Sequence, residues 1–231
     1  MCNHRREFLK GLSFTLAAAA MSSLPDTQLP GQEIKVKTRR GREVMWAPAE
    51  GVGLEYLTLA YRSEDISAEG VVIGPADETP FRVRYKIRCD GAWKTREVML
   101  ELLEEPGARL EFLADGQGHW KTRKGDPVPS LNGCLDVDIS ATPFTNTLVI
   151  RRTSLKPGDS LELYVAYVSV PAMQFEAKRQ RYTCLEVNDL GGRYGFEDLS
   201  SKFRADIQCD SDGLVTDYSG LFRSVWRNSV L

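Results

Sequence analysis

A strict alternation of apolar and cationic residues over 81–88 constrains the fold more than any other feature of this sequence. The apolar positions are Phe81, Val83, Tyr85 and Ile87. The cationic positions between and after them are Arg82, Arg84, Lys86 and Arg88. A period of two is that of a β-strand with one face in the core and the other in water. Four cations in a row repel one another, so we expect acids such as Glu97 and Glu101 on a neighbouring strand. The alternative is a surface that attracts anionic lipid or sugar head groups.

Short apolar segments separated by turn signals continue along the whole chain. Asp90-Gly91, Asp115-Gly116 and Asp212-Gly213 each have the composition of a tight hairpin turn. The segments that predict strands are 34–46, 50–62, 70–74, 81–88, 96–104, 109–115, 161–170, 173–178, 181–187 and 202–209. Strands at this spacing pair with their chain neighbours, so the sequence predicts a mainly β protein, either a large antiparallel barrel, a roll or a sandwich.

Finer expectations concern individual segments. Residues 50–62 and 160–170 are apolar on both parities, which predicts a strand covered on both faces for the first and a central strand of the sheet for the second. A capped helical period never lasts more than about two turns. Short helices are therefore expected only near 197–203 or after Tyr218.

Residues 132–152, NGCLDVDISATPFTNTLVIRR, hold the densest group of acids, hydroxyls, amides and arginines in the chain. An extended strand would place aliphatic side chains on one side and polar ones on the other, namely Leu135, Val137 and Ile139 against Cys134, Asp136 and Asp138. Thr142-Pro143 is expected to end this strand, and 147–152 to form a second one. The bend can bring both carboxylates near Arg151 or Arg152. A head-group site, an acid/base pair, an oxygen-ligand cation site and a charge-paired structural corner all fit this pattern.

The first twenty residues have a different character from the rest. Arg5-Arg6-Glu7-Phe8-Leu9-Lys10 precedes a short apolar run that ends in Ala18-Ala19-Ala20. This resembles a twin-arginine export signal, with His4 where a serine or threonine is usual. The predicted divisions are a signal peptide, a flexible tether and one domain, at 1–20, 21–32 and 33–231. The signal implies the twin-arginine export machinery as a partner and a periplasmic or extracellular location. If the signal is not used, the protein stays in the cytoplasm.

Composition removes several classes of chemistry. A formal charge of −2 and a pI near 5.8 give no reason to expect nucleic acid as a partner. His119 is the one histidine of the sequence outside the signal, and CxxC, P-loop and GxGxxG sequences are absent, so neither a metal nor a cofactor is predicted. The cysteines outside the signal are even in number, which leaves open a disulfide or buried free thiols: Cys89, Cys134, Cys184 and Cys209.

The order GC-x-DVD-x-x-x-TP-x-TNT over 133–147 resembles the putative glycolipid-binding family, once known only as a domain of unknown function. Weaker matches, in the right order, are Arg84-Tyr85, DGAWKTR at 90–96, Gly118-His119-Trp120, Gln180-Arg181-Tyr182 and GLVTDY at 213–218. The resemblance spans about 46–222, with Val149 where the family often has proline and Thr153 where leucine is usual. It implies a spiral β-roll or half-open barrel around one or two short helices, similar in shape to bacterial lipoprotein-carrier and mycobacterial lipid-carrier proteins.

Residue chemistry and this resemblance together predict non-enzymatic binding of a lipid or glycolipid in an apolar groove of a β-roll that acts as a carrier. The expected polar site is Asp136, Asp138, Thr145, Asn146, Arg151 and Arg152, with Tyr85, Trp93, Arg96 and Tyr182 in support. The aromatic residues suited to sugar stacking, or to a core position with a hydrogen-bonded polar tip, are Trp46, Trp93, Trp120, Tyr85 and Tyr182.

Two other function classes also fit the sequence. One is a hydrolase or lyase acting on a sugar-containing substrate, with Asp136 or Asp138 as general base. The other is a structural or interaction module without a small ligand. The cationic face of 81–88 is the expected point of any transient contact with a membrane surface.

Overall fold

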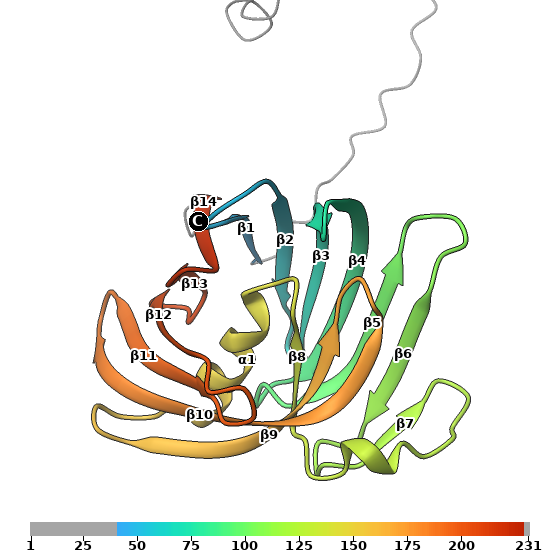
Figure 1. Ribbon diagram of the computed structural model, residues 1–231. Helices are drawn as coiled ribbons and strands as arrows, with labels where there is room; N and C mark the ends of the chain where they lie inside the picture. Colours follow the sequence, from blue (N-terminus) through green and yellow to red (C-terminus); the bar gives the residue numbers. More distant parts are fainter. Residues whose placement is uncertain (1–40, 229–231) are drawn as a thin grey trace, which may run out of the picture. The chain divides into compact units, whose positions relative to one another are not determined.

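One continuous sheet of fourteen strands curves around an α-helix in the computed structural model, which describes residues 41–228 (Figure 1). The strands are β1 Gly41–Pro48, β2 Leu54–Tyr61, β3 Asp65–Ala76, β4 Thr79–Asp90, β5 Thr95–Leu102, β6 Arg109–Ala114, β7 Trp120–Thr122, β8 Asp136–Ile139, β9 Ser160–Ser169, β10 Gln174–Asn188, β11 Gly191–Asp198, β12 Arg204–Asp210, β13 Val215–Tyr218 and β14 Phe222–Arg227. The helix α1 covers Phe144–Thr153, and a 3₁₀ turn, η1, covers Pro129–Leu131. This architecture confirms the predicted mainly β, half-open roll with short helical segments.

The chain builds the sheet in two runs. Strands β1 to β7 pair in order toward one edge, and strands β14 to β8 pair in reverse order toward the other, and the runs meet where β1 pairs with β14. In Figure 1 the blue-to-green wall and the orange-to-red wall are these two runs, with α1 in yellow between them. The sheet stays open between β7 and β8. All strand pairs are antiparallel except β8 with β9, which is parallel. The sheet is therefore mixed, whereas the sequence predicted a wholly antiparallel one.

The predicted second strand over 147–152 is wrong, because these residues belong to α1. A parallel β8–β9 pair needs a crossover connection, and α1 supplies it. The Thr142 hydroxyl accepts the Phe144 N–H at 3.0 Å, and Pro143 has a φ of −76° that suits a helix start. Ser154, at φ 48°, ends the helix. Burial of Leu148, Val149 and Ile150 in the interior of the roll outweighs the strand preference of a β-branched run.

The alternation over 81–88 places β4 as predicted. Val83, Tyr85 and Ile87 are buried on the inner face, and the cationic parity lies on the outer face. Each cation there pairs with a glutamate of a strand or loop beside it, and the pairs are Arg82–Glu104, Arg84–Glu101, Lys86–Glu69 and Arg88–Glu97. The expectation of Glu97 and Glu101 as counter-charges is confirmed.

Strands β2 and β9 each differ in one respect from what their composition predicts. On β2, Leu57 and Leu59 are buried but Leu54 and Tyr56 are 40% and 39% exposed, so one face lies in the core and the other does not. Strand β9 pairs with the edge strand β8 and is therefore next to the edge, not central. The second apolar parity of β2 is thus an exposed face, whereas on β9 the adjacent residues Val165 and Ala166, one of each parity, are both buried, at 0% and 1% exposed.

The helices predicted near 197–203 and after Tyr218 do not form within residues 41–228. The 197–203 segment holds the end of β11 and the turn to β12, where the Asp198 carboxylate accepts the Ser200 N–H at 2.8 Å. The segment after Tyr218 turns directly into β14. Short polar side chains that bond their own backbone favour turns over helices.

The core divides into two clusters that meet at α1. Phe144 and Leu148 pack into the larger cluster, inside the β1–β6 wall, and Val149 and Ile150 pack into the smaller one, beside β9–β13. Thus the helix fills the interior of the roll. All four cysteines of the described part are buried free thiols, so the disulfide alternative is wrong: Cys89, Cys134, Cys184 and Cys209.

The predicted signal peptide over 1–20 and tether over 21–32 lie outside the described residues. Within 41–228, no helix combines the length and the apolar composition that a bilayer span requires.

Candidate ligand-binding site

The two aspartates of β8 have different partners, although they lie two residues apart. Asp136 is fully buried, and Arg152 donates to it from Nε to Oδ1 at 2.9 Å and from Nη2 to Oδ2 at 2.6 Å. Burial raises the pKa of Asp136, and the guanidinium opposes that rise. A buried carboxylate that already holds a bidentate arginine has little capacity left for a ligand. This ion pair therefore fastens α1 to β8.

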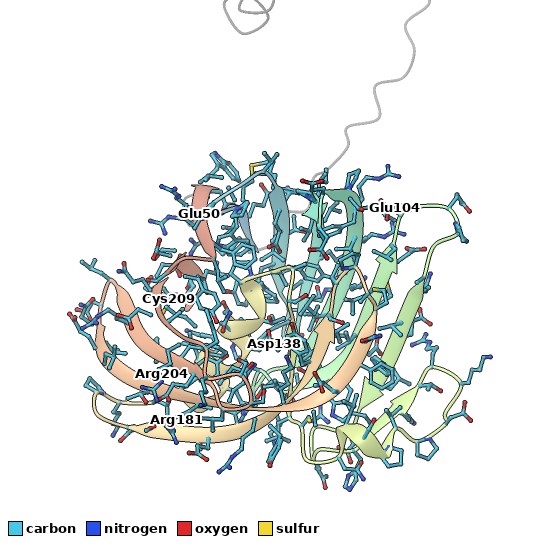
Figure 2. All side chains as sticks on the ribbon, viewed as in Figure 1. Glu50, Glu104, Asp138, Arg181, Arg204 and Cys209 are labelled. Carbon is cyan, nitrogen blue, oxygen red and sulfur yellow. The ribbon has the colours of Figure 1, made fainter. Side chains whose placement is uncertain are left out.

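Asp138, in contrast, has neutral partners. Gln180 Nε2 on β10 donates to its Oδ2 at 2.7 Å, and the Thr145 hydroxyl on α1 donates to its Oδ1 at 3.0 Å. Burial raises the pKa of Asp138, and these two hydrogen bonds oppose the rise. The side chain is partly exposed, and Figure 2 shows it within the curve of the sheet. No cation of residues 41–228 forms an ion pair with it, and it lies at a place that a ligand can reach.

A pocket of about 310 Å³ adjoins Asp138, and we name it the polar pocket. Its remaining polar side chains are Ser140, Thr142, Asn146, Lys178, Gln180, Asp198 and Ser201, and its aromatic ones are Tyr167, Phe196, Phe203, Tyr218 and Phe222. Carboxylate, amide, hydroxyl and ammonium groups beside aromatic rings suit a ligand rich in hydroxyl groups.

Three contacts hold the walls of the polar pocket in place. The Tyr182 hydroxyl donates to Asn146 Oδ1 at 2.9 Å, while Asn146 Nδ2 donates to the Pro143 carbonyl at 3.1 Å. Lys178 Nζ lies 3.7 Å from the centroid of the Tyr167 ring, a cation–π contact. The amide and the ammonium are therefore positioned by the protein before a ligand arrives.

A second cavity of about 240 Å³ lies next to the polar pocket, and we name it the apolar groove. Its apolar side chains are Trp46, Pro48, Val52, Leu54, Val72, Ile73, Pro75, Ala76, Phe81, Ala141, Val170 and Phe222. Val52 and Ile73 are 80% and 52% exposed and form the rim. Ser140 and Phe222 line both cavities, so the polar pocket and the apolar groove share a wall.

Glu55 also lines the apolar groove, and it was not among the predicted site residues. It is 2% exposed on the inner face of β2. The hydroxyls of Tyr85 and Thr142 donate to its Oε1 at 2.5 Å and 2.7 Å. Burial raises the pKa of Glu55 to about 8 against the lowering effect of these two bonds. An acid on the same parity as Leu57 and Leu59 is the signal in the sequence that could have revealed it.

A family model described as "putative glycolipid-binding" matches residues 43–224. The chain belongs to this family. Among solved structures, a DUF1089 family protein from Pseudomonas aeruginosa is 36% identical, with a TM-score of 0.66. The aligned part covers 73% of this chain and 91% of that protein. No curated protein gives a significant match.

In this member of the putative glycolipid-binding family, the fold brings some of the predicted site residues together and separates others. Asp138 and Asn146 line the polar pocket, and Thr145 and Tyr182 hold them. Asp136 and Arg152 form the closed ion pair beside it. Tyr85 binds Glu55 at the apolar groove.

The remaining predicted site residues occupy another region. Arg151 is exposed, and its guanidinium carbon lies 5.4 Å from the centroid of the Trp93 ring. Arg96 Nη2 donates to Asp90 Oδ2 at 2.7 Å and thereby holds the β4–β5 turn. None of these three belongs to the lining of the polar pocket or the apolar groove within 41–228.

The five aromatic residues expected to stack on a sugar or to occupy the core are all at most 5% exposed. Trp46 Nε1 donates to the Val215 carbonyl and Trp120 Nε1 to the Cys134 carbonyl, at 2.7 Å and 2.8 Å. All five are therefore core residues, and the polar tips of Trp46, Trp120, Tyr85 and Tyr182 are hydrogen-bonded, so the alternative of a core position is the correct one. The rings that line the polar pocket come from other positions, on β9, β11, β13 and β14 and next to β12.

Proposed function

We propose that this protein binds a glycolipid, with the sugar in the polar pocket and the acyl chain in the apolar groove. The observation that carries the proposal is that Ser140 and Phe222 line both cavities, because this adjacency puts a polar and an apolar cavity within reach of one amphiphilic molecule. Each cavity alone is at or below the lower end of the roughly 300–1,000 Å³ that enclose a drug-sized ligand. A two-part ligand fits the pair better than either part fits one cavity.

The charges of the polar pocket favour an uncharged sugar. Lys178 stands against two carboxylates, Asp138 and Asp198, so a further anionic group would meet repulsion while hydroxyl groups find both donors and acceptors. The faces of Tyr167, Phe203 and Tyr218 supply apolar area for the C–H face of a sugar ring.

Binding accounts for this geometry better than catalysis. Asp136 is enclosed by Arg152, and Asp138 is held between Thr145 and Gln180. His119 is exposed and lies 2.7 Å from Asp115, on the turn between β6 and β7. A carrier role accords with an open roll, because the groove rim gives the ligand a way in and out.

The groove rim provides the test. The protein is purified without detergent, incubated with glycolipid-containing vesicles, re-isolated and weighed by native mass spectrometry. We expect an adduct with the mass of one glycolipid. Val52→Asp places a charge on the rim and should lower occupancy about tenfold or more. Leu190→Asp is the matched control, since Leu190 is 86% exposed in the β10–β11 turn, outside both cavities. Equal occupancy in the two variants, or no adduct in the wild type, would contradict the proposal.

Asp138→Asn tests the sugar end separately. It keeps the shape of the side chain but removes the charged acceptor, so affinity for a glucosyl lipid should fall about tenfold in calorimetry while affinity for the matching fatty alcohol stays unchanged. A parallel loss for both ligands would place the sugar elsewhere.

We also propose that the protein works outside the cytoplasm, on the basis of the twin-arginine-type segment. Replacing Arg5 and Arg6 together with lysine should retain a fusion to the full chain in the cytoplasm. Export that survives this double substitution would overturn this part of the proposal.

A further inference from the structure

Glu55 has an incomplete set of hydrogen bonds in an otherwise apolar wall. Both of its donors, Tyr85 and Thr142, bind the same oxygen, Oε1. Its Oε2 is buried and has no hydrogen-bond partner among residues 41–228. No cation of the described residues pairs with it either, which distinguishes it from Asp136.

The protonation state of this carboxyl follows from its surroundings. Burial raises the pKa of Glu55 to about 8, so the group is mainly neutral at pH 7. Because Oε1 already accepts two hydrogen bonds, the proton belongs on Oε2. The result is a buried O–H donor without an acceptor, which is an unfavourable arrangement for the ligand-free protein.

Glu55 lies at the boundary between the two cavities, and its Oε2 is enclosed there, so a ligand atom reaches Oε2 only when the carboxyl turns toward the groove. Glu55 lines the apolar groove and Thr142 lines the polar pocket, and the 2.7 Å hydrogen bond between them crosses the wall that the cavities share. Gly70 makes this arrangement possible, since a Cβ at position 70 would overlap the Tyr85 ring. An amphiphile that spans both cavities has the linkage between its sugar and its chain at this level.

We propose that Glu55 donates a hydrogen bond from Oε2 to the carbonyl oxygen of an acyl linkage, either an ester or an amide, in the bound lipid. This role rests on the glycolipid binding proposed above. A carbonyl is an acceptor alone, so it satisfies the O–H and brings no donor of its own. A hydroxyl at the linkage would bring a donor of its own, and Glu55 has no free acceptor for it because Oε1 already accepts hydrogen bonds from Tyr85 and Thr142. Glu55 would thus select acylated lipids over ether-linked ones.

The test uses two probes that differ in one group: glucose 1-decanoate, with the carbonyl, and decyl glucoside, with a methylene in its place. Affinities are measured by calorimetry at pH 6.5. We expect the wild type to bind the ester about tenfold more tightly, the effect of one hydrogen bond to a buried donor. Glu55→Gln keeps a neutral donor and should keep the preference. Glu55→Met removes the donor and should bind both probes equally.

A pH series gives a second measure that does not need Glu55→Met to fold. Tyr85 on β4 is the titratable group that faces Glu55, and burial raises its pKa well above the ordinary value of 10, so Glu55 is the member of this pair that changes state between pH 6.5 and 9. The ester preference of the wild type should disappear across this range, while that of Glu55→Gln should not. Equal affinities in the wild type, or a preference that is unchanged in folded Glu55→Met, would overturn the role of Glu55 and leave glycolipid binding intact. Binding of neither probe would overturn both.

Discussion

The two faces of the sheet carry charge in different ways. On the outer face of β4, four cations stand against glutamates in water, and Lys86 and Glu69 are 49% and 57% exposed. On the inner side, the carboxyls of Glu55, Asp136 and Asp138 lie in or near the core, each with a small set of defined partners. Water can replace an outer partner at little cost, but the loss of a buried inner partner leaves a polar group desolvated and unpaired. Substitution of an ionisable residue on the outer face should therefore change stability little, whereas substitution of one on the inner face should change stability or ligand binding.

The inner carboxyls also differ among themselves. Asp136 is balanced by a full positive charge on Arg152. Asp138 and Glu55 are held by neutral hydroxyl and amide groups, and each lines a cavity. The charge-paired group fastens the helix to the sheet, whereas the two groups with neutral partners retain capacity for a ligand.

Removal of Arg152 should have the largest effect on stability. Arg152→Met leaves Asp136 buried without a counter-charge, and we expect a loss of about 3–5 kcal/mol in the free energy of unfolding in urea. The control is Arg204→Met, because Arg204 is 74% exposed in a pair with Glu197 on the outer side (Figure 2). The double variant Asp136→Asn, Arg152→Met should recover part of the loss. Similar stabilities of the two single variants would refute the distinction between the faces.

Gly70→Ala should come next. The added Cβ overlaps the ring of Tyr85, the side chain that holds Glu55, so we expect overpacking to cost about 1–3 kcal/mol. Gly195→Ala is a matched control on β11, where a Cβ meets its nearest neighbours only at 3.9 Å. Thermal denaturation of both variants checks this. If Gly70→Ala is as stable as Gly195→Ala, the Tyr85 ring is not confined as described.

The outer face of the sheet could be predicted from the sequence, since it depends on local patterns. Alternation placed β4, Asp-Gly pairs placed the hairpin turns, and the acids at Glu97 and Glu101 follow from the need to offset neighbouring cations. The inner face depends on contacts between distant segments. Glu55 and Thr142 are 87 residues apart, and no local pattern connects them.

The helix α1 shows the same limit. Its residues 147–150 read as a strand, and only the roll interior, which the rest of the chain builds, makes a helix the better solution. The local sign was present in Thr142, whose hydroxyl accepts the first helical N–H. The sequence around Asp138 pointed to Asp138, Thr145 and Asn146 of the candidate site. It did not point to Gln180 or Glu55, because their roles come from tertiary contacts.

The pH dependence of stability separates the inner carboxyls from the outer ones. The folded pKa of Glu55 lies above its unfolded value, so the folded state binds the extra proton, and stability falls as pH rises from about 5 to 8. One such proton accounts for a slope of about 1.4 kcal/mol per pH unit at most. Glu55→Gln should lose this pH-dependent contribution. The difference in the free energy of unfolding between the wild type and Glu55→Gln at each pH therefore separates the contribution of Glu55 from that of Asp138. The measurement is urea unfolding at pH 5, 6, 7 and 8, and parallel curves would show that Glu55 is ionised in the folded protein.

Lys86→Gln should have the smallest effect. The ammonium pairs with Glu69 in water, so its loss should change the free energy of unfolding by less than about 1 kcal/mol. The same variant tests whether the cationic face of 81–88 meets membranes. Each of its four cations already has a glutamate partner, so the face has little net charge to attract an anionic bilayer. Sedimentation with anionic vesicles should therefore give the same bound fraction for Lys86→Gln and the wild type. A clear drop in the variant would show that the outer ion pairs open at a membrane, and the outer face would then share in function with the inner one.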